Sequence, residues 1–233
     1  MNASRTARQR VRAELTREIT ETARRHLATE GAAALSLRAV AREMGMVSSA
    51  VYRYFPSRDD LLTALIIDGY NALGAATEQA DGCCRRDDHQ GRWLAACRAV
   101  RDWALAHPHE YSLVYGSPVP GYRAPEQTIG PASRVAAVLG KIISDAQADG
   151  VLAPPPVCPA PPGSFAADAD RLRASVLPDV PDGVAARALA TWAGVFGLVS
   201  FELFGQFENV VTDRGAFFDH AVTCLGRMIG IPA

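Results

Sequence analysis

The stretch from Ser36 to Arg58 constrains the fold of this chain more than any other segment. It holds two short helical patterns that are separated by Gly45 and stopped by Pro56. Glycine takes the left-handed conformation that ends a helix at little cost, and proline lacks the backbone N–H that continues one. The first pattern repeats at i, i+3, i+4 and i+7, which is the spacing of one helix face. Its members are Leu37, Val40, Ala41 and Met44. Ser36 stands directly before them, and we expect its hydroxyl to cap the helix.

The second pattern separates apolar from polar residues. Met46, Val51 and Phe55 are expected to face inward. The outward face combines small residues, hydroxyls and one guanidinium, which suit base edges and phosphates. It consists of Ser48, Ser49, Ala50, Tyr52, Arg53 and Tyr54. A helix, a glycine turn and a second helix together predict a DNA-reading helix-turn-helix.

Helical patterns on both sides supply a core for this motif. Before it, apolar residues recur every four positions from Val11 to Leu27, and Gly31 follows them. After it, Ser57 and two acidic residues begin another helix, whose apolar pattern continues to about Thr77. Two short helices bury little apolar surface alone, so the preceding helix is expected to pack on them and complete a three-helix domain.

The two ends of the chain differ in charge. Residues 1–60 contain 11 arginines and 7 acidic residues, a net charge of +4, whereas the remainder carries −5. Residues 1–10 contain Arg5, Arg8 and Arg10 without apolar periodicity, and we expect a flexible basic arm there. Such an arm either contacts phosphates and the minor groove or is simply solvated. The positive charge of residues 1–60 favours contact between the N-terminal part of the chain and the phosphates of a nucleic acid. The alternative is that the imbalance is ordinary scatter in surface charge.

Residues Ala34 to Ala64 resemble the N-terminal domain of the TetR/AcrR family of bacterial transcriptional regulators. The likeness lies in the order SLRxVAxxMG, YRYFxSR and LLxA, and it covers about residues 10–70. It implies an all-α fold, with a helix-turn-helix domain at 11–58 and a ligand-binding and dimerisation domain at 59–233. It also implies which residues touch DNA. Phosphates would be contacted by Ser36, Arg38 and Arg58. Bases would be contacted by Ser48, Ser49, Ala50 and Arg53, and either phosphates or base edges by Tyr52 and Tyr54.

The sequence departs from the family pattern at Val47 and Ser49. The family usually has Ser or Thr at the first position, where it caps the recognition helix, and Gly or Pro at the second. Valine has no side-chain acceptor for a backbone N–H. Either Ser48 caps a helix that starts one residue later, or about 1 kcal/mol of capping free energy is lost.

The remainder of the chain also reads as helical. Helices are predicted at 89–107, 109–116, 133–150, 165–176, 182–207 and 213–229. A polar break at 80–88, a long loop at 117–131 and a proline-rich segment at about 153–163 separate them. Six prolines in that last segment exclude a helix, so we interpret it as a polyproline-like linker, with a docking motif for a partner domain as the alternative.

The last two predicted helices carry more apolar surface than one small domain covers. The helix at 182–207 is apolar nearly all round, so it is expected to be buried on every side. We expect homodimerisation through about 182–207 and 213–230, and the resemblance implies a four-helix bundle across a two-fold axis. The stretch from Trp192 to Leu198 is similar to a family subtype named for a Trp-His-Gly signature, but Phe196 replaces its histidine.

Cysteines and histidines form no recognisable reactive or metal-binding motif. The five cysteines are an odd number without metal-ligand spacing, which favours a reduced, intracellular protein. Adjacent Cys83 and Cys84 are either a redox switch or inert. His107 and His109 are two residues apart, but nothing in the pattern completes a metal site. No nucleophile stands beside a base and no phosphate-binding glycine loop is present, so no catalytic residue, metal or cofactor is predicted.

The sequence therefore predicts a cytoplasmic, ligand-controlled transcriptional regulator that is not an enzyme. It is expected to bind a palindromic operator in double-stranded DNA as a homodimer, and to be a repressor released by an apolar or aromatic small molecule. The aromatic candidates for the effector site are Trp103, Tyr111, Tyr115, Trp192 and Phe196, whose alternative is plain core packing.

The ligand is expected to favour one arrangement of the helix from Asp59 to Thr77. No membrane contact is predicted, because the longest apolar run, 188–201, is too short to span a bilayer and no signal peptide opens the chain. The competing hypothesis is a DNA-independent helical dimer that acts as a protein-interaction module.

Overall fold

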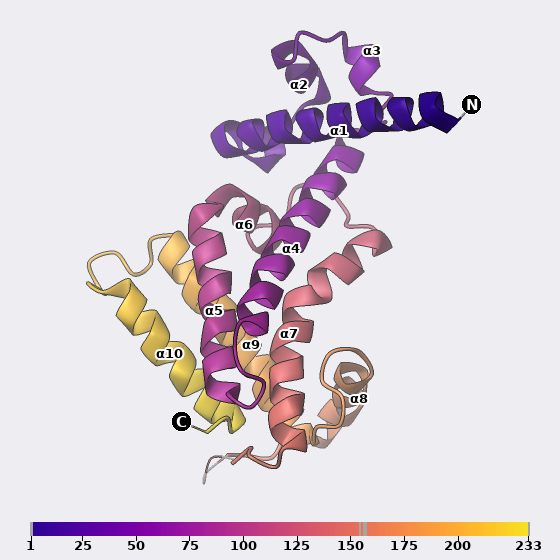
Figure 1. The fold of residues 1–233 in the computed structure, drawn as a ribbon. Helices are drawn as coiled ribbons and strands as arrows, with labels where there is room; N and C mark the ends of the chain where they lie inside the picture. The colour runs from indigo at the N-terminus through magenta and orange to yellow at the C-terminus, as the bar shows by residue number, and fades with distance from the viewer. Residues whose placement is uncertain (1, 154, 156–157, 233) are drawn as a thin grey trace. The chain divides into compact units, whose positions relative to one another are not determined.

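A computed structural model describes residues 2–153, 155 and 158–232, and side chains from Gln9 onward. Over these residues the chain consists of helices, turns and loops without a strand, as the sequence predicted (Figure 1). The elements are α1 (Asn2–Glu30), η1 (Ala32–Ala34), α2 (Leu37–Glu43), α3 (Ser48–Val51), α4 (Arg58–Gly82), α5 (His89–Ala106), α6 (Pro108–Tyr115), η2 (Glu126–Thr128), α7 (Ile129–Ala148), η3 (Gly163–Phe165), α8 (Ala166–Ser175), α9 (Asp182–Leu203) and α10 (Arg214–Ile229).

The helices form two compact units, whose bounds are not those of the domains expected at 11–58 and 59–233, and that domain division stays a prediction. Unit 1 comprises Met1–Tyr70 and His107–Ile129, and unit 2 comprises Asn71–Ala106 and Gly130–Ala233. The difference arises because α4 supplies buried leucines to the core of unit 1, and because residues after α6 pack on that same core. No local sequence pattern shows that the first part of α4, or the residues after α6, pack in unit 1.

Unit 1 is built around the helix-turn-helix. Its buried apolar core is contributed by α1, the segment between η1 and α2, α2, α3, the turn after α3, and α4. Helices α2 and α3 lie beside α1 in Figure 1. The core residues are Ile19, Ala23, Leu35, Leu37, Val40, Ala41, Val51, Phe55, Leu61, Leu62 and Leu65. Leu113, Val119 and Tyr122, from α6 and the loop after it, pack against this core. The three-helix packing that the periodicity predicted is present.

Helix α1 begins at Asn2, whereas the sequence predicted no regular structure before Val11. Residues 2–10 lack an apolar stripe, but they also lack proline and glycine, so the helix can extend through them. The side chains of residues 1–8, including Arg5 and Arg8, lie outside the described part of the structure. Arg10 is exposed. The contacts expected of a basic arm therefore remain a prediction.

Unit 2 packs α9 against α5, α8 and α10. The Trp93 indole of α5 donates to the Val222 carbonyl of α10 at 2.8 Å, and Arg101 of α5 forms a two-pronged pair with Glu202 of α9 at 2.6 and 2.7 Å. A buried arginine, Arg92, joins α5 to Asp81 of α4. These polar contacts fix the register of the helices around an apolar core.

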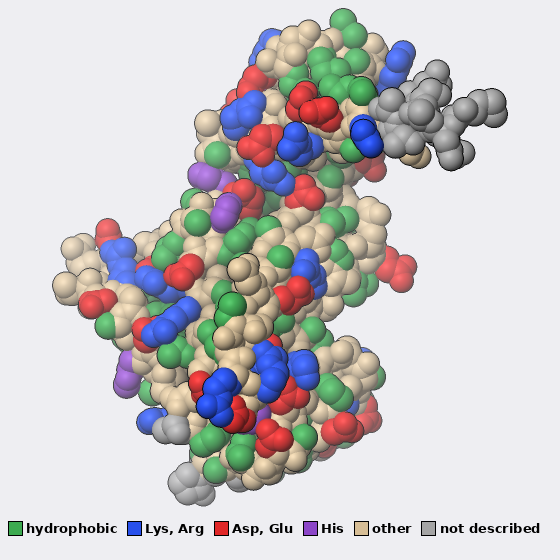
Figure 2. Space-filling view, in the orientation of Figure 1, with side chains coloured by type: hydrophobic (Ala, Val, Ile, Leu, Met, Phe, Trp, Pro, Cys, Tyr) green, Lys and Arg blue, Asp and Glu red, His purple; other side chains and the backbone are tan. Residues whose placement is uncertain are grey.

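Several predicted boundaries shift by a few residues. Helix α4 continues to Gly82 instead of about Thr77, and α7 begins at Ile129 instead of Ser133, because Pro131 is tolerated in a first helical turn. The proline-rich segment contains no helix at its described residues before η3 begins at Gly163, while positions 154 and 156–157 lie outside the described part. Acidic and basic side chains are interspersed on the face shown in Figure 2.

Helix α9 extends beyond the apolar run at 188–201 that the sequence judged too short to span a bilayer, and it is the one described helix that is long and apolar enough to cross a membrane by length and composition. Core helices of soluble proteins share this property. Within unit 2, α9 packs against three other helices, and its charged residues are partnered: Arg187 donates to the Ile229 carbonyl, and Glu202 pairs with Arg101. We therefore interpret α9 as a core helix with one uncovered face.

Candidate nucleic-acid interface and apolar cavity

The turn between α2 and α3 is held by two backbone hydrogen bonds around Gly45. The Met46 N–H donates to the Ala41 carbonyl at 2.9 Å, and the Gly45 N–H donates to the Arg42 carbonyl at 3.1 Å. Gly45 has φ of +65°, a conformation that side chains with a Cβ disfavour. The predicted glycine turn is therefore confirmed, and it sets the direction in which α3 leaves α2.

The starts of α2 and α3 lack side-chain caps. Ser36 occupies the N-cap position of α2, but its hydroxyl makes no capping hydrogen bond, contrary to expectation. Val47 occupies the N-cap of α3, which begins at Ser48. Of the two alternatives for this helix, the structure has the uncapped one. The Val47 side chain is 72% exposed, so packing does not compensate for the missing cap.

Helix α3 ends at Val51, and residues 52–55, which the sequence placed in the same helix, form a turn after it. The helix and this turn together present polar residues outward and apolar residues inward. Val51 is fully buried and Phe55 is 6% exposed, which anchors α3 in the core of unit 1. Ser49, Tyr52 and Arg53 are exposed. Ser48, Ala50 and Tyr54 are half-buried. The exposed surface carries a hydroxyl, a phenol and a guanidinium, the groups that contact bases and phosphates.

Arg12 of α1 holds the end of this segment, a contact that the sequence did not indicate. Its guanidinium lies 5.3 Å from the centre of the Tyr54 ring and donates to the Arg53 carbonyl at 3.4 Å. The Arg53 side chain remains exposed. Tyr54 is consequently covered on one face by a cation, which leaves less of it for contact with DNA than the sequence implied.

Arg58 and Arg38, both predicted to contact phosphate, have different surroundings. The Arg58 guanidinium donates to the carbonyls of Leu35 at 3.1 Å, Ala32 at 2.8 Å and Ala33 at 3.2 Å. It therefore fastens the start of α4 to η1. Arg38 is exposed near the start of α2, where Ser36 is half-buried.

Ion pairs brace α1 against the helices that it supports. Arg25 and His26 contact the Glu43 carboxylate of α2 at 2.8 and 2.7 Å, and Arg24 contacts Asp68 of α4 at 2.8 Å. The Arg25 hydrogen bond lowers the pKa of Glu43, whereas burial raises the pKa of Asp68 despite the nearby arginine. The recognition segment is thus held by a core beneath it and by charge pairs around it.

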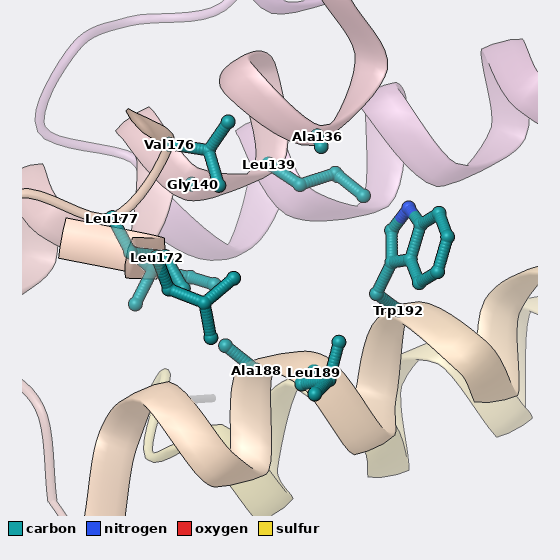
Figure 3. A pocket seen from close by; sticks show the side chains of 10 residues that line it. Ala136, Leu139, Gly140, Leu172, Val176, Leu177, Ala188, Leu189 and Trp192 are labelled. Atoms are coloured by element: carbon teal, nitrogen blue, oxygen red, sulfur yellow. The ribbon is translucent and has the colours of Figure 1, made fainter. Parts of the chain in front are cut away.

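A cavity of about 240 Å³ lies in unit 2 between α7, α8 and α9. Its walls are aliphatic apart from one indole, as Figure 3 shows. The lining residues are Ala136, Leu139, Gly140 and Ile143 of α7, Leu172 of α8, Val176 and Leu177 after it, and Ala188, Leu189 and Trp192 of α9.

Comparison with known proteins decides the class of this chain. The family described as bacterial regulatory proteins, tetR family, matches residues 19–65, which include α2 and α3. A tetracyclin repressor-like C-terminal domain matches residues 93–225. The chain belongs to the TetR family.

Relatives support this assignment along nearly the whole length. The HTH-type transcriptional regulator Rv1816 of Mycobacterium tuberculosis is 41% identical over 215 residues, which cover 91% of each chain. The solved structure of the regulatory protein SCO4313 is 34% identical, with a TM-score of 0.76 over 93% of this chain and 97% of that one. A tetR-family structure from Rhodococcus RHA1, 18% identical with a TM-score of 0.62 over 94% and 98%, shares the fold. This TetR-family protein is a DNA-binding transcriptional regulator and not an enzyme.

The aromatic residues proposed for an effector site of this regulator are divided between the two units. Tyr111 and Tyr115 belong to unit 1, with ring centres 5.2 Å apart, and burial raises the pKa of Tyr115. Trp192 and Phe196 belong to unit 2 and are 5.3 Å apart. Trp103, also of unit 2, is 8% exposed. Trp192 is the one of the five that lines the cavity, whose aliphatic walls carried no sequence signal.

The cysteines and histidines of this regulator form no cluster of three or more potential metal ligands within the described residues. Cys97 is buried, which raises the pKa of its thiol. Cys83 is exposed, and the thiol of neighbouring Cys84 contacts the Ala80 carbonyl at 3.5 Å. A redox role for this pair stays a prediction.

Proposed function

We propose that this regulator binds a palindromic operator as a homodimer and represses transcription until a small apolar or aromatic effector binds. The observation that carries the proposal is the outward face of α3 and of the turn after it, where Ser49, Tyr52 and Arg53 are exposed above a buried Val51. These side chains are held by the core of unit 1 and remain available for base edges and phosphates. The phosphate contacts of Ser36 and Arg38 belong to the same proposal.

The homodimer is supported by uncovered apolar side chains on α9 and α10. Phe201, Phe204 and Phe217 are 53%, 47% and 38% exposed in the single chain. Large exposed aromatic groups on adjacent helices are typical of an interface. One recognition helix contacts few base pairs, so two copies that read successive major grooves supply the affinity and specificity of an operator complex.

Effector control is supported by the apolar cavity in unit 2, while α4 runs as one helix through residues of both units. An effector changes DNA affinity only if it favours one conformation over another, and couplings of about 1–3 kcal/mol are typical. We also assign this regulator to the Trp-His-Gly subtype, on the strength of Trp192 and Gly197. Since Phe196 replaces the histidine, no role of an imidazole is proposed.

Fluorescence anisotropy with duplexes from the intergenic DNA beside its gene tests the proposal. The wild type should bind one duplex tightly, and the logarithm of the affinity should fall linearly with the logarithm of salt concentration. The double variant Tyr52→Ala with Arg53→Ala should lose at least about tenfold in affinity. Arg85→Ala is the matched control, because its side chain is 82% exposed in a loop of unit 2 and the charge change is the same.

Two outcomes would contradict the proposal. Binding that is equally weak for every duplex at low salt would favour the DNA-independent helical dimer. Equal losses of affinity in the double variant and in Arg85→Ala would show that net charge, and not the face of α3, is responsible for binding.

A further inference from the structure

The cavity between α7, α8 and α9 has the chemistry of a site for an uncharged ligand. None of its ten lining side chains carries a charge or a hydroxyl, and the Trp192 indole at its edge is 37% exposed (Figure 3). Burying a charged group among such walls is strongly unfavourable. An engineered apolar cavity of about 150 Å³ holds benzene, so about 240 Å³ accommodates one aromatic ring with a short substituent.

The walls of this cavity are held in place by contacts on either side of it. A Cβ on Gly140 would lie 1.8 Å from the Val176 carbonyl oxygen, so the chain after α8 presses directly onto α7. The Ser144 hydroxyl of α7 donates to the Pro178 carbonyl at 2.9 Å. Arg173 of α8 pairs with Asp182 at the start of α9 at 2.7 Å. The space is therefore bounded by helices that are fixed to each other.

Helix α7, which lines the cavity, is also hydrogen-bonded to α4 through Arg134. Arg134 lies two positions before Ala136, and its guanidinium donates to both Glu78 carboxylate oxygens at 2.8 and 2.6 Å. It further donates to the backbone and side-chain oxygens of Asn71 at 2.8 and 2.9 Å. Gly74 makes the approach possible, because a Cβ there would lie 2.7 Å from Arg134. Four hydrogen bonds thus join the wall of the cavity to two turns of α4.

We propose that this cavity is the effector site, that its ligand is a small uncharged apolar molecule such as a substituted benzene, and that Arg134 transmits occupancy from α7 to α4. The inference rests on the proposed effector control of DNA binding. It places the effector between α7, α8 and α9, in place of a site formed by all five aromatic residues that the sequence proposed. Arg134 is then a positioning residue that does not touch the ligand.

Calorimetric titration of the full chain with toluene tests the site, with benzoate as a charged ligand of the same shape. Toluene should bind saturably and benzoate should not. Ala136→Leu fills the cavity and should weaken toluene binding at least tenfold. Ala137→Leu adds the same atoms at an exposed position of the same helix and should leave binding unchanged. Ala188→Leu fills the cavity from α9 and gives a second variant should the first fail to fold.

Three results would overturn the assignment of the site. In the first, toluene binds neither the wild type nor any of the leucine variants. In the second, Ala136→Leu and Ala137→Leu bind toluene equally. The third is that Ala136→Leu keeps toluene binding but weakens dimerisation in sedimentation experiments, which would assign the cavity to the interface between two copies.

DNA anisotropy in the presence of toluene tests the transmission. Saturating toluene should lower the operator affinity of the wild type at least about fivefold. Arg134→Ala should bind toluene as the wild type does but lose this response, and Arg134→Lys should restore part of it. A full response in Arg134→Ala, or none in the wild type, overturns the role of Arg134. If no duplex binds at all, the proposed function fails, while the toluene titration still decides the site.

Discussion

Two exposed faces of this regulator carry opposite chemistry. The turn that follows α3 exposes Tyr52 and Arg53, whereas the faces of α9 and α10 expose Phe201 and Phe217. A polar face is stable in water and contacts phosphates and bases when they are present. A large apolar face in water is unfavourable until another surface covers it. The two faces therefore suit different kinds of contact, and under the proposed function these are nucleic acid for unit 1 and a second copy for unit 2.

The comparison extends to arginines that are five residues apart in unit 1. Arg53 leaves its guanidinium exposed, while Arg58 donates to three backbone carbonyls of the segment before α2. One residue is available to a ligand and the other is part of the framework.

Phe201→Glu places a charge on the apolar face of α9 and should prevent that face from pairing with a second copy. An unpaired charge buried in a dimer costs on the order of 3 kcal/mol or more, so the dissociation constant of the dimer should rise roughly 100-fold or more. Sedimentation velocity over a concentration series measures the change. Phe201→Leu keeps the face apolar and should stay dimeric. A Phe201→Glu variant that dimerises like the wild type would show that this face is not the interface.

Arg58→Ala should destabilise the protein by about 1–3 kcal/mol, because it leaves the carbonyls of Ala32 and Leu35 without their partner. Arg53→Ala should change stability by less than about 0.5 kcal/mol, as exposed substitutions usually do. Urea unfolding of the two variants measures the difference. If both lose equal stability, the distinction between a framework arginine and a DNA-contacting arginine is wrong.

Val47→Thr should stabilise the protein by about 1 kcal/mol, since threonine supplies the side-chain acceptor that the N-cap of α3 lacks. Thermal unfolding by circular dichroism measures the gain. Val47→Ala provides the control, because it removes the exposed methyl groups without adding an acceptor. An equal gain in the alanine variant would point to relief of exposed apolar surface.

The Glu43 pair gives the smallest expected effect, a dependence of stability on pH. Hydrogen bonding to Arg25 lowers the folded-state pKa of Glu43 below the ordinary value of 4.5. The pair therefore stabilises the fold fully above that value and stops doing so as the pH falls through the lower folded-state pKa. Glu43→Gln should flatten this part of the curve in urea unfolding at a series of acidic pH values. If the free energy of unfolding of Glu43→Gln depends on acidic pH as strongly as that of the wild type, the Glu43 pair does not contribute to that dependence.

The helices and the turn of the recognition segment could be predicted because their causes are local. The apolar spacing from Leu37 to Met44, the left-handed turn at Gly45 and the start of α4 at Ser57 all follow from neighbouring residues. In the structure the Ser57 hydroxyl accepts from the Asp60 N–H at 3.1 Å, as a capping serine should. The face of α3 followed from the same periodicity.

Contacts between distant segments could not be predicted in this way. Arg12 reaches Tyr54 and Arg58 reaches Leu35 through the tertiary fold, and no spacing in the sequence joins these positions. The cavity is bounded by alanine, leucine and glycine, which look like ordinary core residues. The sequence predicted an effector site of aromatic residues instead, and of these five residues Trp192 lines the cavity.

Hydroxyl-radical footprinting on the bound intergenic duplex shows whether two copies of this regulator contact DNA through α3 and the turn after it. If the polar face of α3 reads DNA and the apolar faces of α9 and α10 pair two copies, the footprint should show two related protected blocks whose centres are a whole number of helical turns apart, about 10–10.5 base pairs each. Phe201→Glu should reduce both blocks together. A single block, or two blocks that survive unchanged in Phe201→Glu, would contradict the account.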